Sequence, residues 1–144
     1  MAIIRPITEE EQKAWPKDVI VPLEAAFVDP RGAIQPLVDL AMESCVLITS
    51  RKGTTRADHY HQTDWHFCYV LSGSIEYLHR PHGSSETPKK TLVKEGQLFF
   101  TPPMVDHAMY FPQDSTFIVL GRNSRVQAVY EADVVRIPAL RTEK

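Results

Sequence analysis

The chain has 144 residues and a mass of 16.4 kDa, which favours one domain that buries a hydrophobic core without disulfide support. Sixteen lysine and arginine residues stand against eighteen aspartate and glutamate residues, giving a formal net charge of −2. This balance argues against a nucleic-acid or membrane surface held by bulk charge, so neither partner is expected.

Two cysteines, Cys45 and Cys68, are too few for a disulfide framework and favour free thiols in a reducing compartment. The first six residues lack the longer apolar run of a signal peptide, and no stretch approaches the length of a membrane span. Together these features predict a cytoplasmic protein.

The first 26 residues contain scattered prolines and no sustained helical period, so we expect an N-terminal extension that packs on the main domain. Thr8 precedes three glutamates, which predicts one short helix with Thr8 as its N-cap and acidic side chains in its first turn. Residues 27–37 predict a strand, a tight turn and a second strand, because Pro30 and Gly32 supply turn chemistry.

The remaining chain alternates short β-branched or aromatic runs with turn residues. Strands are predicted at 45–49, on both sides of residues 62–65, and at 74–78, 91–94, 97–101, 107–111 and 116–120. Residues 79–90 are polar and predict an exposed loop, whereas residues 131–136 show no clear pattern. About nine or ten short strands with regular turns predict an all-β sandwich or barrel.

Three of the six histidines, His59, His61 and His66, fall within eight positions. His59 and His61 share a face of an extended strand, and the polar break after them allows the chain to bend and bring in His66. A fourth candidate, His107, follows Pro102 and Pro103. A single histidine is more often a surface or hydrogen-bonded residue, but this clustering favours a shared transition-metal site.

The spacing of these residues resembles the two motifs of the cupin superfamily. The first motif is matched by Gly53, His59, His61, His66 and Gly73, with His66 where the family usually has glutamate. The second is matched by Gly96, Pro102 and His107, whereas Met104 and Phe111 depart from it. The resemblance implies a small jelly-roll β-barrel over residues 27–137, followed by a tail at 138–144. It also implies one divalent metal held by His59, His61, His66 and His107, and a homodimer with the N-terminal segment packed across it.

A narrower resemblance, to the WxcM-like cupins, covers most of the chain. It is carried by Asp29-x-Arg31-Gly32, Arg56-x-x-His59-x-His61, Gly73-Ser74, Pro102-Pro103 with His107, and the segment at 130–136. That family comprises sugar-nucleotide ketoisomerases, near relatives of keto-sugar epimerases. The resemblance implies proton transfer by the pair His59 and His61 without a metal, so the extra imidazoles here exceed what that chemistry needs.

Four neutral imidazoles leave the charge of a divalent ion uncompensated, which makes the ion a stronger Lewis acid toward a substrate oxygen. Zinc, nickel, iron and manganese all suit such ligands. A site with two histidines and one carboxylate, typical of iron oxygenases, would need Asp64 to join. We therefore expect polarisation of a substrate carbonyl in preference to dioxygen activation.

The expected reaction is enolisation of a small-molecule substrate, with a base beside the metal. Asp64 shares the parity of His66 and is either that base, a residue that orients a ligand, or a turn residue. Arg31 and Arg56 are candidates to bind a phosphate or carboxylate, although surface solvation is a common role for arginine.

Two aromatic residues complete the candidate substrate site. Trp65 stacks on substrate or fills the core. Tyr77 is the last candidate, and the sequence leaves open whether Tyr77 or its neighbour Glu76 faces the interior.

Three functions follow from this pattern. The first is a metal-dependent isomerase or epimerase of a keto-sugar nucleotide. The second is a non-haem metal-dependent dioxygenase acting on a small diketone or phenol. The third is a non-catalytic binding protein in which the metal is structural and has no open coordination position.

Overall fold

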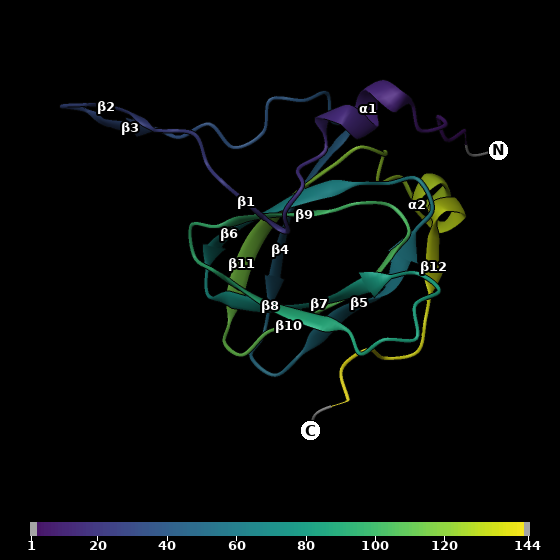
Figure 1. Cartoon of the computed structure of the whole chain (residues 1–144). Coiled ribbons are helices and arrows are strands. Elements are labelled where there is room, and N and C mark those ends of the chain that lie inside the picture. The colour runs from purple at the N-terminus through teal and green to yellow at the C-terminus, as the bar shows by residue number, and fades with distance from the viewer. Residues whose placement is uncertain (1–2, 143–144) are drawn as a thin grey trace.

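The computed structural model describes residues 3–142, which form two five-stranded antiparallel sheets packed face to face (Figure 1). One sheet has the order β1-β9-β6-β11-β4 and the other the order β12-β5-β10-β7-β8. Their strands are β1 (Ile20–Val21), β4 (Ser44–Ser50), β5 (Thr55–His61), β6 (His66–Ser72), β7 (Ser74–Pro81), β8 (Lys89–Lys94), β9 (Leu98–Thr101), β10 (Val105–Tyr110), β11 (Ser115–Gly121) and β12 (Val134–Arg136). The predicted all-β jelly-roll barrel is confirmed.

The hydrophobic core lies between the two sheets because alternate residues of each strand point inward. In β11 the burial alternates along the whole strand, with Phe117 and Val119 facing the interior. The rings of Phe117 and Phe111 stack with their centroids 5.6 Å apart. Val70 and Ile75 are fully buried beside them. This cluster closes one end of the barrel.

The inward-facing residues become polar toward the other end of the barrel. In β6 the series runs from Val70 through Cys68 to His66, and in β10 from Met109 to His107. Two strands of opposite sheets therefore present imidazoles at the same end. This gradient, from apolar to imidazole, positions the candidate site.

The described part of the chain has two helices, which flank the barrel. The predicted short helix is α1 (Glu9–Ala14), with Thr8 as its N-cap and a capping box between Thr8 and Glu11. The segment left unassigned by the sequence forms the end of α2 (Gln127–Asp133) and all of β12, which pairs with β5. Among the described residues, neither helix has the length and apolar character needed to cross a membrane.

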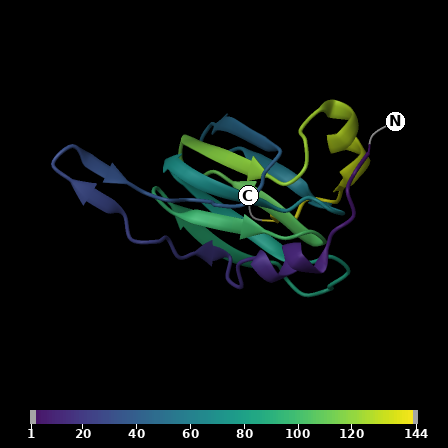
Figure 2. The same ribbon diagram turned by 90° about the horizontal axis from the view of Figure 1, so that it is seen from above.

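The predicted strand–turn–strand forms β2 (Phe27–Asp29) and β3 (Gly32–Ile34), a hairpin that stands away from the barrel (Figures 1 and 2). The prediction of a loop over 79–90 was wrong at both ends. β7 continues to Pro81 because its polar residues pair with β10 as far as Val105. β8 begins at Lys89 because this residue pairs with His79 of the extended β7.

Gly73 connects β6 to β7 with a φ of 87°, in the left-handed region. A Cβ atom at this position would lie 2.4 Å from the carbonyl oxygen of Asp114, a backbone atom that has little freedom to move. Gly53 has a similar φ of 85°, but nothing lies within 4 Å of its Cβ position.

We predict that Gly73→Ala lowers the free energy of unfolding by roughly 3 kcal/mol, because backbone strain and a steric clash add. Gly53→Ala provides the matched control and is expected to lower it by only about 1 kcal/mol, from strain alone. Denaturant unfolding of the two variants measures both values. Equal losses would show that the contact with Asp114 is without effect.

Candidate functional site

Four imidazoles from three strands meet inside the polar end of the barrel. His59 and His61 come from β5, His66 from β6 and His107 from β10. The ring centroids of His59 lie 4.7 Å from those of both His61 and His107, and His66 lies 5.6 Å from His61 and 5.7 Å from His107. The structure thus brings together all four histidines that the sequence proposed as ligands.

Burial keeps three of these rings neutral. It lowers the pKa of His59 to about 3, with further lowering by the neighbouring His61 and His66. Burial likewise lowers the pKa of His66, against an opposing effect of Asp64, and holds that of His107 well below its usual value. A neutral imidazole retains a lone pair, which both metal binding and proton abstraction require.

Hydrogen bonds fix the orientation of two of the rings. Nδ1 of His107 donates to the carbonyl oxygen of Val105 at 2.9 Å, and Nδ1 of His61 donates to Oδ2 of Asp133 at 2.9 Å. In each ring the lone pair is then on Nε2. Burial opposes ionisation of Asp133, but the hydrogen bonds from His61 and Thr63 outweigh it and hold the pKa of this carboxyl below its usual value.

The donor atoms fit a transition metal. One ring nitrogen from each of His59, His61 and His107 lies within 4.8 Å of the others, and the same holds for His61, Asp64 and His66. Neutral imidazole nitrogen suits zinc, nickel or iron, and the carboxylate of Asp64 adds a harder oxygen donor. Because His61 belongs to both groups, the two arrangements share one ligand.

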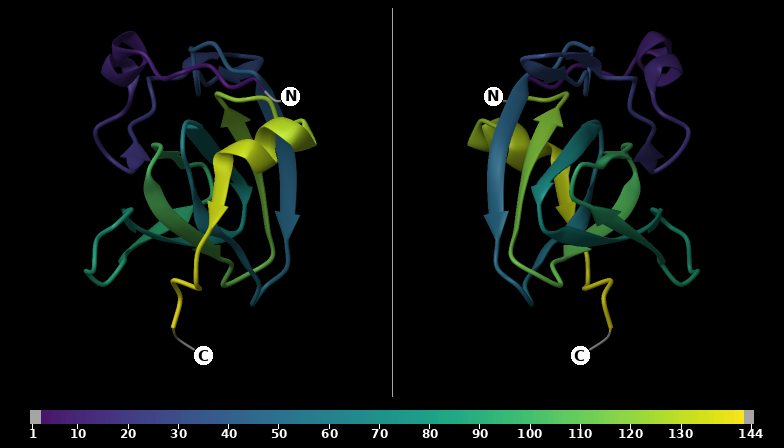
Figure 3. Two further views of the ribbon diagram at one scale, coloured as in Figure 1. Left: turned by 90° about the vertical axis from the view of Figure 1, so that its right-hand side faces the viewer. Right: turned by 90° about the vertical axis from the view of Figure 1, so that its left-hand side faces the viewer.

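The imidazoles line a cavity of about 460 Å³ between the two sheets. α2 lies across this side of the barrel, between β12 and β4 (Figure 3). Its Tyr130 lines the cavity, with its ring centroid 5.8 Å from His61 and 6.5 Å from His59. Burial raises the pKa of Tyr130, so its hydroxyl stays protonated at neutral pH.

Two of the other predicted site residues line the same cavity. Arg56 donates through Nε to the hydroxyl of Ser50 at 2.7 Å and through Nη2 to the carbonyl oxygen of Thr49 at 3.0 Å. Asp64 accepts from the backbone N–H of Asn123 at 2.8 Å, and its other oxygen lies 3.6 Å from Nδ1 of His66.

The other three predicted substrate-binding residues lie outside this cavity. Trp65 is 3% exposed and packs among aromatic rings of the core. Tyr77 is 1% exposed, faces the interior, and shares a hydrogen bond of 2.8 Å with the hydroxyl of Thr101. Arg31 lies on the projecting hairpin, where it pairs with Asp29.

The predicted site did not include the ionisable cavity residues of the C-terminal region, which are Arg125, Tyr130 and Asp133. The guanidinium carbon of Arg125 lies 4.9 Å from the ring centroid of Tyr130. The segment at 130–136 contributed to the resemblance noted in the sequence, and that was the only signal for Tyr130 and Asp133.

Residues 46–121, just over half of the chain, match the family model described as Cupin domain. A search of curated proteins finds no match.

Solved structures with the same fold include sugar-nucleotide enzymes. The 3,4-ketoisomerase QdtA from Thermoanaerobacterium thermosaccharolyticum, solved in complex with TDP, is 18% identical, with a TM-score of 0.65 over 81% of this chain and 85% of its own. A 3,4-ketoisomerase from Helicobacter canadensis is 17% identical (TM-score 0.66, 81% and 88% coverage). The dTDP-4-dehydrorhamnose 3,5-epimerase from Sulfolobus tokodaii is 21% identical (TM-score 0.59, 72% and 69% coverage).

Because His59 has a lower pKa folded than unfolded, the unfolded chain takes up its proton first as the pH falls. We predict that the stability of chelator-treated protein is insensitive to this group above about pH 6.5 and declines between about pH 6.5 and pH 3. His59→Asn should make the free energy of unfolding less dependent on pH in this window, lowering its slope against pH by at most about 1.4 kcal/mol per pH unit. Denaturant unfolding at several pH values measures it, and an unchanged slope would contradict the assignment.

Proposed function

Because the chain belongs to the cupin domain family, we propose that it is an isomerase or epimerase of a keto-sugar nucleotide. The observation that carries this proposal is the buried pair of His61 and Asp133 at the wall of a cavity large enough for a sugar. Solved structures with the same fold include two sugar 3,4-ketoisomerases and a 3,5-epimerase, and this agreement supports the reaction class.

His61 is the proposed base. Its Nδ1–H is held by the carboxylate of Asp133, so Nε2 carries the lone pair that accepts a proton from the carbon beside the substrate carbonyl. The imidazolium that forms is stabilised by the same carboxylate. Tyr130 is the proposed acid: its raised pKa keeps the hydroxyl protonated, and its ring lies beside His61, so it could donate a proton in the same reaction.

The anionic part of a sugar nucleotide needs cationic partners, and two arginines line the cavity. Arg56 uses two of its N–H donors for Ser50 and Thr49, which fixes the plane of its guanidinium and leaves further donors for a phosphate. Arg125 is exposed beside Tyr130 on the same cavity. Binding of the diphosphate by these residues would orient the sugar toward the imidazoles.

The imidazoles would also hold one divalent transition metal, through His59, His61 and His107 or through His61, His66 and Asp64, and this metal would supply Lewis acidity toward the substrate carbonyl oxygen. Nε2 of His61 has one lone pair, so it serves either as base or as ligand. If His61 is a ligand, Asp64 is the remaining candidate for the base. Removal of metal tests this alternative: turnover that survives chelation excludes a Lewis-acid step and leaves Nε2 of His61 free to act as the base.

We predict that Asp133→Asn lowers turnover of a keto-sugar nucleotide by roughly 100-fold or more, because the amide no longer stabilises an imidazolium. Tyr130→Phe is expected to have an effect of similar order. Each variant is incubated in D2O with a panel of keto-sugar nucleotides. Incorporation of deuterium at the carbon beside the carbonyl measures the proton transfer.

Glu131→Gln is the control, since Glu131 is on the same helix but pairs with Arg136 at the surface. It should keep wild-type turnover. Absence of deuterium incorporation with every keto-sugar nucleotide would reject the proposed function.

One observation favours a second candidate, a non-haem iron dioxygenase of a small diketone or phenol. His61, Asp64 and His66 offer two imidazoles and one carboxylate within 4.8 Å, the donor set found in many iron(II) oxygenases. Oxygen consumption by iron-loaded protein with such substrates tests it, and Asp64→Ala should abolish that consumption.

The protein is further proposed to act as a homodimer through the β2–β3 hairpin. On this hairpin the side chains of Phe27, Val28 and Ile34 are between 60% and 71% exposed. Leu47 is also exposed, on β4 at the edge of the five-stranded sheet that contains β11. A two-fold arrangement brings the same apolar surface of each copy together and removes it from water.

We predict that the double variant Phe27→Ser with Val28→Ser shifts the protein from dimer to monomer. Light scattering coupled to size-exclusion chromatography measures the mass. Leu92→Ser, at an exposed apolar position of β8, is the control and should leave the mass unchanged. A monomeric wild-type protein would reject the dimer.

A further inference from the structure

Arg122, which directly follows β11, is the largest fully buried side chain of the described residues and is 1% exposed. A guanidinium stays charged, so burial is tolerable only when its N–H groups are paired. Arg122 makes five such hydrogen bonds: two to the carboxylate of Glu11, one to each carbonyl oxygen of Arg5 and Pro6, and one to the side-chain oxygen of Asn123. Four of the five therefore lead to the N-terminal segment.

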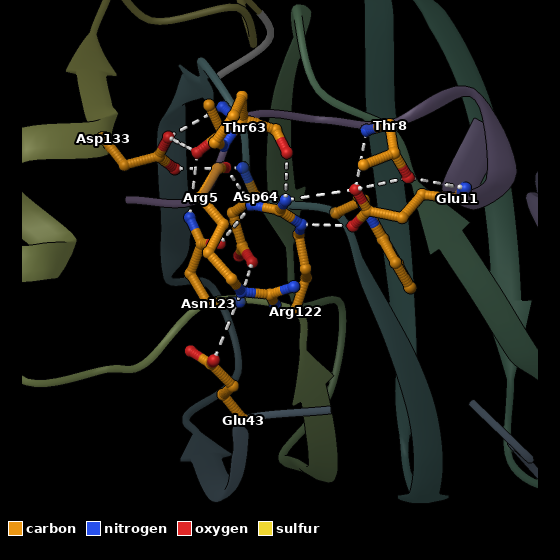
Figure 4. A network of polar contacts seen from close by, with 11 residues as sticks. Arg5, Thr8, Glu11, Glu43, Thr63, Asp64, Arg122, Asn123 and Asp133 are labelled. Carbon is orange, nitrogen blue, oxygen red and sulfur yellow. Dashed lines mark hydrogen bonds and ion pairs between the residues drawn. The ribbon is translucent and has the colours of Figure 1, made fainter. Parts of the chain in front are cut away.

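The fifth hydrogen bond, from Arg122 to Asn123, leads away from the N-terminal segment toward Thr63 and Asp133 (Figure 4). Because Oδ1 of Asn123 accepts from Arg122 at 2.9 Å, its amide nitrogen points to the hydroxyl of Thr63, 3.0 Å away. That hydroxyl in turn donates to Oδ1 of Asp133 at 2.6 Å, and the other oxygen of Asp133 accepts from His61. Donation thus runs from Arg122 through Asn123 and Thr63 to Asp133, whose carboxylate accepts from Thr63 on one oxygen and from His61 on the other.

A second branch leads to His66. The backbone N–H of Asn123 donates to Asp64, whose other oxygen faces Nδ1 of His66. Glu11 also accepts from the indole N–H of Trp65 at 3.3 Å, so it contacts the residue between Asp64 and His66 in the chain. One carboxylate in α1 therefore binds Arg122, directly after β11, and Trp65, in the turn before β6.

We propose that Glu11 and Arg122 are positioning residues, which act through Asn123, Thr63 and Asp133 to fix the orientation and tautomer of His61. This inference rests on the proposed function only in treating His61 as a site residue. It assigns the N-terminal segment a part in the site, although neither Glu11 nor Arg122 lines the cavity.

The sharpest variant is Glu11→Gln. Glutamine retains a side-chain acceptor for the capping box of α1 but removes the negative charge opposite Arg122. The melting temperature should fall by roughly 10 °C, because a buried charge loses its counter-ion. Glu10→Gln, on the same helix at an exposed ion pair with Lys13, is the matched control and should leave it within about 1 °C.

The readout is the ring nitrogen and ring proton signals of His61 in the full-length, chelator-treated protein, measured by NMR without substrate. In the wild type, His61 should give the Nδ1–H tautomer with a hydrogen-bonded ring proton. Glu11→Gln should displace or broaden these signals, whereas Glu10→Gln should not. The signals of His79 and His82, which lie outside the cluster, serve as an internal reference in both variants.

A second variant separates positioning from stability. Glu11→Leu with Arg122→Met replaces the ion pair by apolar side chains, and it is expected to recover most of the melting temperature while Asn123 stays without its donor. The His61 signals should remain displaced. If they return with the melting temperature, or if neither variant moves them, the proposal is overturned. Because no substrate is present, a failure of the turnover assay would reject the proposed function and leave this result standing.

Discussion

The hydrogen bond between Asp133 and His61 is the interaction on which the polar end of the barrel depends. A carboxylate that is 2% exposed is stable only when its oxygens are filled, and Asp133 accepts from His61, from the backbone and hydroxyl of Thr63, and from the N–H of Asp64. These bonds tie α2 to the turn between β5 and β6. They also select the tautomer of His61 that leaves the lone pair of Nε2 available. The same hydrogen bond therefore stabilises the fold and prepares the imidazole of the candidate site.

The barrel supports this arrangement by separating its two ends. Apolar side chains such as Val70 and Phe117 fill one end, which provides the free energy that offsets burial of imidazoles at the other. Because side chains alternate along each strand, His66 and His107 face inward in the same series as the core residues that follow them. The site is thus a continuation of the core, with nitrogen donors in place of methyl groups.

Sequence reasoning predicted the barrel and the histidine cluster because both depend on local rules. Turn residues and alternation locate strands, and the spacing of His59 and His61 places both on one face. Asp133 follows from no such rule: it reaches His61 across 72 positions, from a segment without a clear period. Trp65 shows a different limit, since an indole suits both a sugar and a core, and its neighbours Trp15 and Phe100 are fixed only by folding.

Cys68 lies in the wall of the cavity, one inward-facing position beyond His66. Burial raises the pKa of its thiol far above the usual range, so the sulfur keeps its proton at neutral pH. A ketone or aldehyde that enters the cavity therefore meets a poor nucleophile. A carbonyl substrate of the proposed kind would therefore not be trapped there as a thiol adduct, although a cysteine lies in the cavity wall.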